Sequence, residues 1–317
     1  MPPDPQATRV AVIDIGTNST RLLVAEVQSG ALTELERQTT ITRLGQGVDA
    51  TGRLADEAIE RVLAAVAGYR EAIDRHQVAH TIAVATSAMR DAANGEDLRE
   101  ELQMRHGVDA RTISGEEEAR LTFLGATGAR PPSTTRTLVI DIGGGSTEFV
   151  LGAAGTQPDF HVSTQAGSVR QTERHLKEDP PAQQHIADLA LEVQLIIENG
   201  VPDEVRRSAA AGIAVAGTAT SLAAIDQALE PYDPSKVHGY VLGLGACERM
   251  LAMLAALPLG DRRALPGLHP DRAPTIVAGA AILVEAMRSF GLEAVETSEA
   301  DILHGAALAA AIPRSGP

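Results

Sequence analysis

Two glycine-containing turns carry the residues of this chain that are most suited to chemistry. Ile-Asp-Ile-Gly-Thr-Asn-Ser-Thr-Arg occupies residues 13–21, and Ile-Asp-Ile-Gly-Gly-Gly-Ser-Thr-Glu occupies residues 140–148. Glycine lets a backbone approach a ligand closely, and exposed amides and hydroxyls donate hydrogen bonds to an anion. One such turn could equally be a structural hairpin. Two matching turns, each beginning after an Asp, favour phosphate binding.

Carboxylates lie on both sides of the second turn, at Asp141 and Glu148. Hard oxygen donors beside phosphates suit Mg²⁺, with Mn²⁺ as a substitute. Either residue could instead cap a turn or lie at the surface, but the adjacent glycine turn favours a metal site. Arg21 stands in the first turn where Glu148 stands in the second. We therefore expect the metal in the second half of the chain only.

Two further segments offer anion-binding geometry. Residues 217–221, Gly-Thr-Ala-Thr-Ser, lie between an expected strand and an expected helix, so Gly217 and Thr218 can bind an anion at the helix N-terminus. Thr86-Ser87 followed by Arg90 offers the same geometry plus a cation. None of these segments is a Walker P-loop, because Gly-Lys-Ser and Gly-Lys-Thr are absent from the sequence.

Three consecutive glutamates, Glu116, Glu117 and Glu118, begin an expected helix after Ser114. Ser114 and Glu117 fit a capping box, and acidic residues in a first helical turn favour the helix dipole. One of the three carboxylates could instead activate a water molecule that attacks phosphorus. The residues alone do not choose among them.

The elements that must position these residues occur twice along the chain. Residues 82–87 resemble residues 213–221, as the two turns resemble each other, which indicates two similar domains joined by a Gly/Pro/Ser/Thr-rich linker at residues 125–137. Apolar runs predict a strand on each side of each turn. Helical periodicity predicts helices over residues 56–73 and 186–196. The pattern is typical of α/β domains.

Composition excludes several other classes of protein. A net charge of −15 and the absence of Trp argue against nucleic-acid binding. All but two of the 27 basic residues are arginine, which suits bidentate phosphate recognition. The single cysteine, Cys247, excludes an intramolecular disulfide. Residues 1–5 do not resemble a signal peptide, and the longest uncharged stretch, residues 208–225, is too polar to span a membrane. We expect a soluble, cytoplasmic protein without a membrane partner.

The ordered motifs resemble those of the exopolyphosphatase and guanosine pentaphosphate phosphohydrolase (Ppx/GppA) family, in the superfamily of actin, sugar kinases and heat-shock chaperones. The resemblance extends over nearly the whole chain and rests on residues 14–19, 85–90, 114–120, 141–148 and 217–221. It implies two actin-like (ribonuclease H-like) α/β domains, residues 1–127 and 128–317, with an active-site cleft between them and a last helix able to pack back on the first domain.

The resemblance also implies roles for single residues. Glu118, directly before Ala-Arg, matches the catalytic base, and Asp141 and Glu148 match the Mg²⁺-associated acids. The matching phosphate contacts are Asn18, Ser19, Arg90, Gly143, Gly144, Gly145 and Ser146, and Arg43 and Arg170 look like further contacts, with an ordinary surface Arg as the alternative. His238 is expected in a local hydrogen bond, and no function is assigned to Lys236. Residues 302–305 depart from the family's Leu-Arg-Glu-Gly, so no role is assigned to His304.

The expected activity is hydrolysis of the terminal phosphoanhydride of inorganic polyphosphate. Long members of the family continue into a further helical region, so a chain ending at Pro317 is expected to be a short, two-domain form that favours short polyphosphate. The nearest alternative is removal of the 5′ phosphate of guanosine pentaphosphate (pppGpp), with pppGpp or ppGpp as a ligand. An actin-like ATP-binding kinase or a non-catalytic phosphate or alarmone sensor fits less well. A homodimer is implied by the resemblance alone.

Overall fold

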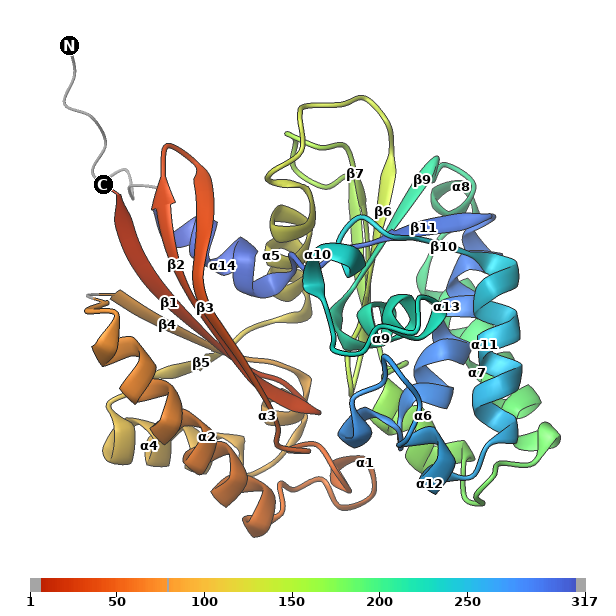
Figure 1. Cartoon of the computed structure of the whole chain (residues 1–317), viewed down its shortest axis with the longest axis horizontal. Helices are drawn as coiled ribbons and strands as arrows, with labels where there is room; N and C mark the ends of the chain where they lie inside the picture. The colour runs from red at the N-terminus through yellow and green to blue at the C-terminus, as the bar shows by residue number, and fades with distance from the viewer. Residues whose placement is uncertain (1–6, 79, 312–317) are drawn as a thin grey trace. The chain divides into compact units, whose positions relative to one another are not determined.

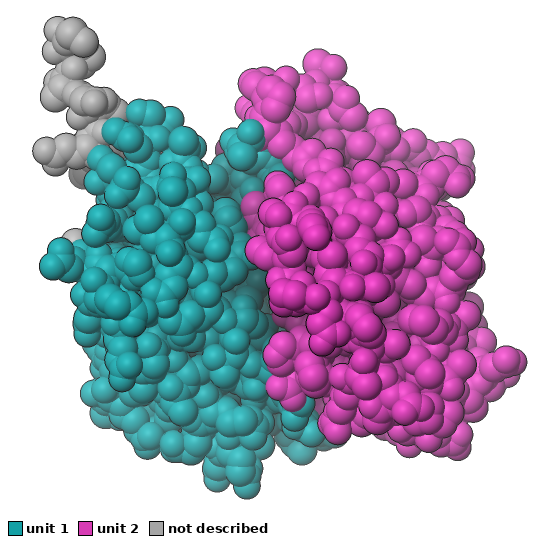
Figure 2. All heavy atoms as spheres, viewed as in Figure 1, with its two compact units in different colours: residues 1–129, 302–317 teal, residues 130–301 magenta. Residues whose placement is uncertain are grey.

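The computed structural model describes residues 7–78 and 80–311 and divides the chain into two compact units. Unit 1 contains Met1–Ala129 and Ile302–Pro317, and unit 2 contains Arg130–Asp301 (Figure 2). The division therefore falls after residue 129, where the sequence analysis places it after residue 127. Residues 1–5, which do not resemble a signal peptide, lie outside the described residues.

Unit 1 is built on a five-stranded sheet in the order β3-β2-β1-β4-β5. The first three strands pair antiparallel, and β4 and β5 run parallel to β1. The strands are β1 (Thr8–Ile15), β2 (Ser19–Gln28), β3 (Ala31–Ile41), β4 (His80–Ala85) and β5 (Ala110–Thr112).

Helices cover both faces of this sheet (Figure 1). Alternate side chains of β1 point to opposite faces. Ile13 and Ile15 pack in one cluster with residues of α2, whereas Val10 and Val12 pack in another with α14. The described helices of unit 1 are α1 (Val48–Thr51), α2 (Asp56–Arg75), α3 (Ser87–Asp91), α4 (Gly95–His106), α5 (Gly115–Thr127) and α14 (Ile302–Ala311).

Unit 2 repeats the arrangement. Its sheet has the order β10-β11-β9-β6-β7-β8, in which β8-β7-β6-β9-β11 matches the five strands of unit 1 and β10 is an addition. The strands are β6 (Thr137–Ile142), β7 (Thr147–Gly152), β8 (Phe160–Thr164), β9 (Ala211–Val215), β10 (Val241–Gly243) and β11 (Ala294–Thr297). The shared order confirms two similar α/β domains of the actin-like, ribonuclease H-like type.

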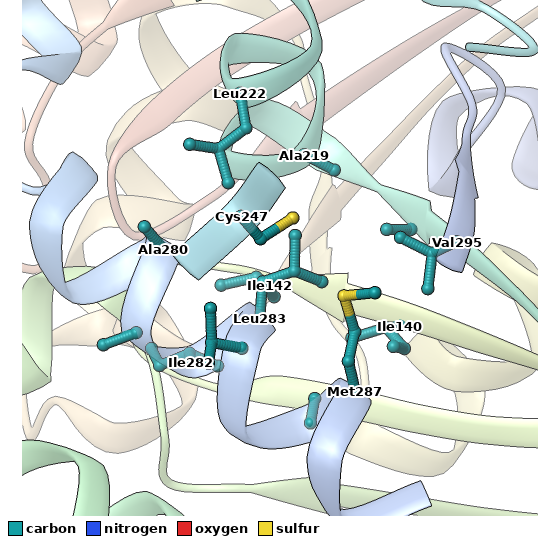
Figure 3. Packing of buried hydrophobic residues seen from close by; sticks show 14 of the residues in the cluster. Ile140, Ile142, Ala219, Leu222, Cys247, Ala280, Ile282, Leu283, Met287 and Val295 are labelled. Carbon is teal, nitrogen blue, oxygen red and sulfur yellow. The ribbon is translucent and has the colours of Figure 1, made fainter. Parts of the chain in front are cut away.

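The core of unit 2 surrounds α13, and almost every residue of this helix is buried. Cys247 lies in the same apolar cluster as Ile142, Leu222 and Leu283 (Figure 3). Burial raises the pKa of its thiol to about 12, so the cysteine has a packing role. The described helices are α6 (Ser168–His175), α7 (Gln183–Gly200), α8 (Asp203–Arg206), α9 (Ala216–Asp226), α10 (Pro234–Val237), α11 (Leu244–Ala256), α12 (Leu259–Arg262) and α13 (Ile276–Phe290), with a 3₁₀ turn, η1, at Pro270–Arg272.

The structure confirms the predicted strands on each side of both turns, which are β1 and β2 in unit 1 and β6 and β7 in unit 2. It also confirms the predicted helices: α2 covers residues 56–73, and α7 covers residues 186–196. The predicted start of the linker at residue 125 is wrong, because α5 continues to Thr127. Helix α14 packs closely against α5 at this point: a Cβ on Gly305 of α14 would lie 1.8 Å from the Leu121 carbonyl oxygen and 3.1 Å from the Gly125 nitrogen. Among residues 7–78 and 80–311, the structure contains no helix with both the length and the apolar character of a membrane span.

The stability of unit 1 is expected to depend on pH through Glu36 of β3. Hydrogen bonds from Arg75 (2.8 Å) and Gln38 (2.7 Å) lower the pKa of this carboxyl from 4.5 to about 2, and the bond from Arg75 has the larger effect. A lowered pKa in the folded state stabilises the fold above pH 4.5, and the contribution disappears as the pH falls toward 2. Glu36→Gln should therefore reduce the free energy of unfolding by about 1 kcal/mol at pH 7, and by less at pH 3.5.

Urea denaturation of both proteins at the two pH values measures this difference. Glu71→Gln is the matched control, because Glu71 is an exposed residue of α2 whose side chain makes no hydrogen bond or ion pair in the described structure. An equal loss from Glu36→Gln at pH 7 and pH 3.5 would contradict the assignment.

Candidate active site

The glycine turn of unit 2 connects β6 to β7. The Gly143 amide donates to the Ser146 carbonyl at 3.0 Å and closes the turn. Asp141 and Glu148 are directly paired across the two strands, so their side chains lie on one face of the sheet. Both are buried, with 7% and 1% of their surface exposed. The turn therefore brings the two predicted metal-binding carboxylates together.

Residues 167–170 form hydrogen bonds to the carbonyls of this turn, and we call them the bracing segment of unit 2. The Ser168 amide donates to the Gly143 carbonyl at 2.9 Å, and the Val169 amide donates to the Gly144 carbonyl at 2.8 Å. Nε of Arg170 donates to the Gly145 carbonyl at 2.9 Å. All three glycine carbonyls of the turn are thus engaged.

The amides of Gly144 and Gly145 take no part in these hydrogen bonds. Within residues 7–78 and 80–311, the structure gives neither amide a hydrogen-bond acceptor. Consecutive backbone amides without protein acceptors form an anion-binding site of the kind that holds phosphate. The predicted phosphate role of this turn therefore has a specific donor set, the amides of Gly144 and Gly145.

The first turn, in unit 1, is built in the same way. The Gly16 amide donates to the Ser19 carbonyl at 3.0 Å, as in the second turn. Residues 42–45 form the bracing segment here. The Thr42 and Arg43 amides donate to the Asn18 carbonyl at 3.1 and 2.9 Å. The two turns are therefore closed by the same hydrogen bond, and each is held by a bracing segment.

The two turns differ in charge. Arg21 is paired with Asp14 across β1 and β2, where Glu148 is paired with Asp141 in unit 2. Nε and Nη2 of Arg21 lie 2.9 and 2.7 Å from one oxygen of Asp14. The first turn thus carries a cationic side chain at the position where the second carries a carboxylate, as the sequence indicates.

Arg43 and Arg170, predicted as phosphate contacts, occupy the two bracing segments. Arg43 has a left-handed backbone with φ of 49°, which is uncommon for a residue other than glycine. Arg170 braces Gly145 through its side chain. Their places in the bracing segments were not predicted, because most of the bracing hydrogen bonds come from backbone amides, which every residue except proline provides.

The structure separates the three glutamates at the start of α5. Ser114 caps the helix by accepting from the Glu117 amide at 3.2 Å, but Glu117 does not complete a capping box, because its carboxylate pairs with Arg111 at 2.6 Å. Glu116 is exposed. Glu118 is buried, and Nη1 of Arg90 lies 3.2 Å from its carboxylate and 2.9 Å from the Ile113 carbonyl. Only Glu118 is both buried and placed against a predicted phosphate-binding arginine.

Gly217 and Thr218 lie in the first turn of α9, directly after β9. A Cβ on Gly217 would lie 1.4 Å from Nη1 of Arg272, so this guanidinium lies against the glycine. The Thr218 side chain packs against Gly279 of α13, where a Cβ would lie 2.6 Å from its hydroxyl. Thr218 can therefore offer an anion its amide more readily than its side chain. Arg272 was missed, because nothing near it in the sequence distinguishes it from other arginines.

The remaining polar candidates have local partners. Nδ1 of His238 accepts from the Glu299 amide at 3.2 Å, which confirms the local hydrogen bond. Lys236 lies 3.9 Å from Asp233, and Nδ1 of His304 lies 3.4 Å from Arg37. None of these contacts gives the three residues a catalytic role.

The similarity to known proteins extends over nearly the whole chain. The model of the Ppx/GppA phosphatase family matches residues 23–311. This chain belongs to that family. It is 39% identical to exopolyphosphatase 2 of Mycobacterium tuberculosis, over 96% of this chain and 99% of that protein. A solved exopolyphosphatase-like protein is 35% identical with a TM-score of 0.88, covering 96% of this chain and 98% of its own. The Ppx/GppA family member of Aquifex aeolicus is 30% identical with a TM-score of 0.82, covering 98% of this chain and 100% of its own.

Proposed function

We propose that this protein is an exopolyphosphatase, which hydrolyses the terminal phosphoanhydride of inorganic polyphosphate and releases orthophosphate. The observation that carries the proposal is the second glycine turn. It combines the amides of Gly144 and Gly145, which have no acceptor in the described part of the chain, with the paired carboxylates of Asp141 and Glu148. The family and the exopolyphosphatases among the relatives support the same activity.

The predicted site residues have distinct roles in the proposed reaction. In unit 2, the amides of Gly144 and Gly145 bind the terminal phosphoryl group, whereas the Gly143 amide closes the turn. The first turn of α9 adds a second anion-binding segment. In unit 1, Asn18, Ser19 and Arg90 provide further donors. Glu118 accepts a proton from water, the water oxygen bonds to phosphorus, and the bridging P–O bond breaks. The shortened polyphosphate leaves with the electrons of that bond.

Asp141 and Glu148 are proposed to hold Mg²⁺, or Mn²⁺ in its place. The described residues contain no group of three or more His, Cys, Asp or Glu side chains arranged as a metal site. Two carboxylates still fit Mg²⁺, which typically takes one or two protein carboxylates and completes its shell with water and substrate phosphates. When bound, the ion would neutralise charge on the phosphate oxygens.

Short polyphosphate is the proposed preference. A long polyanion is gripped by a track of basic residues, and the net charge of −15 disfavours such a track. Local groups still bind a short anion, because surface charges more than about 8 Å away are largely screened at physiological salt. The 5′ phosphate of pppGpp is the alternative substrate at the same groups. The homodimer stays a prediction.

Orthophosphate release from short polyphosphate, long polyphosphate and pppGpp, measured in parallel with Mg²⁺, tests the proposal. We expect the fastest release from short polyphosphate, and background release from all three with Glu118→Gln as the matched blank. Faster release from pppGpp would instead favour the alternative. Binding of the three compounds without any release would indicate a sensor.

A further inference from the structure

A third polar residue continues the row that contains the two carboxylates of unit 2. Asp141 on β6 is paired with Glu148 on β7, and Glu148 is paired with Ser163 on β8. Residues directly opposite one another on neighbouring antiparallel strands project from the same face. Ser163 therefore lies beside Glu148, on the side away from Asp141.

The hydroxyl of Ser163 contacts the Glu148 carboxylate directly. Its Oγ lies 2.6 Å from Oε1 of Glu148. This separation is within the range of hydrogen bonds from a hydroxyl to a carboxylate, which are shorter and stronger than those between neutral groups. Because a carboxylate only accepts, the serine is the donor. Glu148 is 1% exposed, so such a donor also compensates for the loss of hydration.

We infer that Ser163 is a positioning residue, whose hydroxyl fixes the Glu148 carboxylate in the orientation in which it and Asp141 share a divalent cation. This inference rests on the proposed metal role of those two residues. A donor bonded to one carboxylate oxygen restricts rotation of the group and directs the other oxygen. Ser163 is the penultimate residue of β8, and residues 167–170 then brace the glycine turn. One segment thus supports both the carboxylate and the phosphate-binding turn.

The equivalent row of unit 1 shows why such a donor is specific to unit 2. There the row is Asp14, Arg21 and Thr39. Arg21 itself donates to Asp14, so the charge of that pair is balanced inside the row. In unit 2, Asp141 and Glu148 are both acidic, and the Ser163 hydroxyl on β8 donates to Glu148.

Mn²⁺ binding to the full-length protein, followed by electron paramagnetic resonance of the free ion, tests the role independently of catalysis. Ser163→Ala should weaken Mn²⁺ binding about 10- to 100-fold. Turnover with the same variant should recover at saturating Mn²⁺, because the missing hydroxyl changes metal affinity more than the chemical step. Ser163→Thr keeps the hydroxyl in a residue favoured in strands, and should bind Mn²⁺ nearly as the wild type does.

Ser208→Ala is the matched control, because it also removes one hydroxyl of unit 2, hydrogen-bonded at 2.8 Å to the Val205 carbonyl outside the site. Its Mn²⁺ affinity should be unchanged. Equal losses from Ser163→Ala and Ser208→Ala would overturn the positioning role in favour of general destabilisation.

Glu148→Gln separates the failure of this inference from the failure of the metal proposal. If Glu148→Gln binds Mn²⁺ as tightly as the wild type, the metal role of Glu148 is wrong, and the inference about Ser163 fails with it. If Glu148→Gln binds weakly while Ser163→Ala binds normally, only the role of Ser163 is overturned.

Discussion

Replacing Glu118 with glutamine is expected to lower kcat for polyphosphate hydrolysis by about 10²- to 10⁴-fold, the usual contribution of a general base. Glutamine has nearly the same shape and keeps an oxygen that can accept from Arg90, which lies 3.2 Å from the carboxylate. It cannot accept the proton of the attacking water. The variant should therefore fold normally and bind substrate while losing turnover.

Steady-state orthophosphate release, together with the melting temperature, measures the effect. Glu117→Gln is a closely matched control, because it makes the same change one residue earlier on α5, in a side chain that pairs with Arg111. Its activity should be close to that of the wild type. Near-normal turnover by Glu118→Gln would remove Glu118 from the proposed role.

Gly167→Ala is expected to distort the glycine turn of unit 2, although residue 167 lies outside that turn. A Cβ at this position would lie 2.2 Å from the Gly144 carbonyl oxygen and 2.3 Å from the Gly145 carbonyl carbon. These are backbone atoms, so no side-chain rotation relieves the overlap, and the turn must move. Such overpacking typically costs about 1–3 kcal/mol of stability. Displacing the amides by about 1 Å can lower kcat/KM on the order of 10²-fold.

Gly68→Ala supplies the matched control, since a Cβ on this glycine of α2 would meet no atom within 4 Å. It should stabilise the helix by up to about 1 kcal/mol and leave turnover unchanged. Ser168→Ala is a milder test, because it removes only the 3.1 Å bond from the Ser168 hydroxyl to the Gly143 carbonyl. Wild-type kcat/KM in both Gly167→Ala and Ser168→Ala would show that bracing does not position the turn.

Local sequence predicted the two turns well because their structure is local. The Gly143 amide bonds to a carbonyl three residues away, and the paired strands follow at once on both sides. The same reasoning was wrong at residue 125, where a glycine read as linker lies inside α5. In the sequence, a glycine inside a helix that packs against another helix cannot be told from a glycine in a loop. Only the position of the partner helix distinguishes these two environments.

Nor could the sequence choose among the three glutamates of α5. All three fit the first turn of a helix, and the choice of Glu118 came only from its resemblance to a family motif. In the structure, Glu117 faces Arg111 and Glu118 faces Arg90, partners that lie 6 and 28 residues away in the chain. The helix directs successive side chains to different surroundings, and those surroundings give each carboxylate its own partner.

The sequence by itself determined the duplicated α/β design, the two turns and the charge difference between them, because each depends on residues close together in the chain. Only the tertiary structure revealed the bracing segments, the row that ends at Ser163 and the contact of Arg272 with Gly217. These features join residues 15 to 55 positions apart through backbone amides or ordinary side chains. Such groups occur throughout the chain, so only the folded positions of the strands and helices select the ones that support the turns.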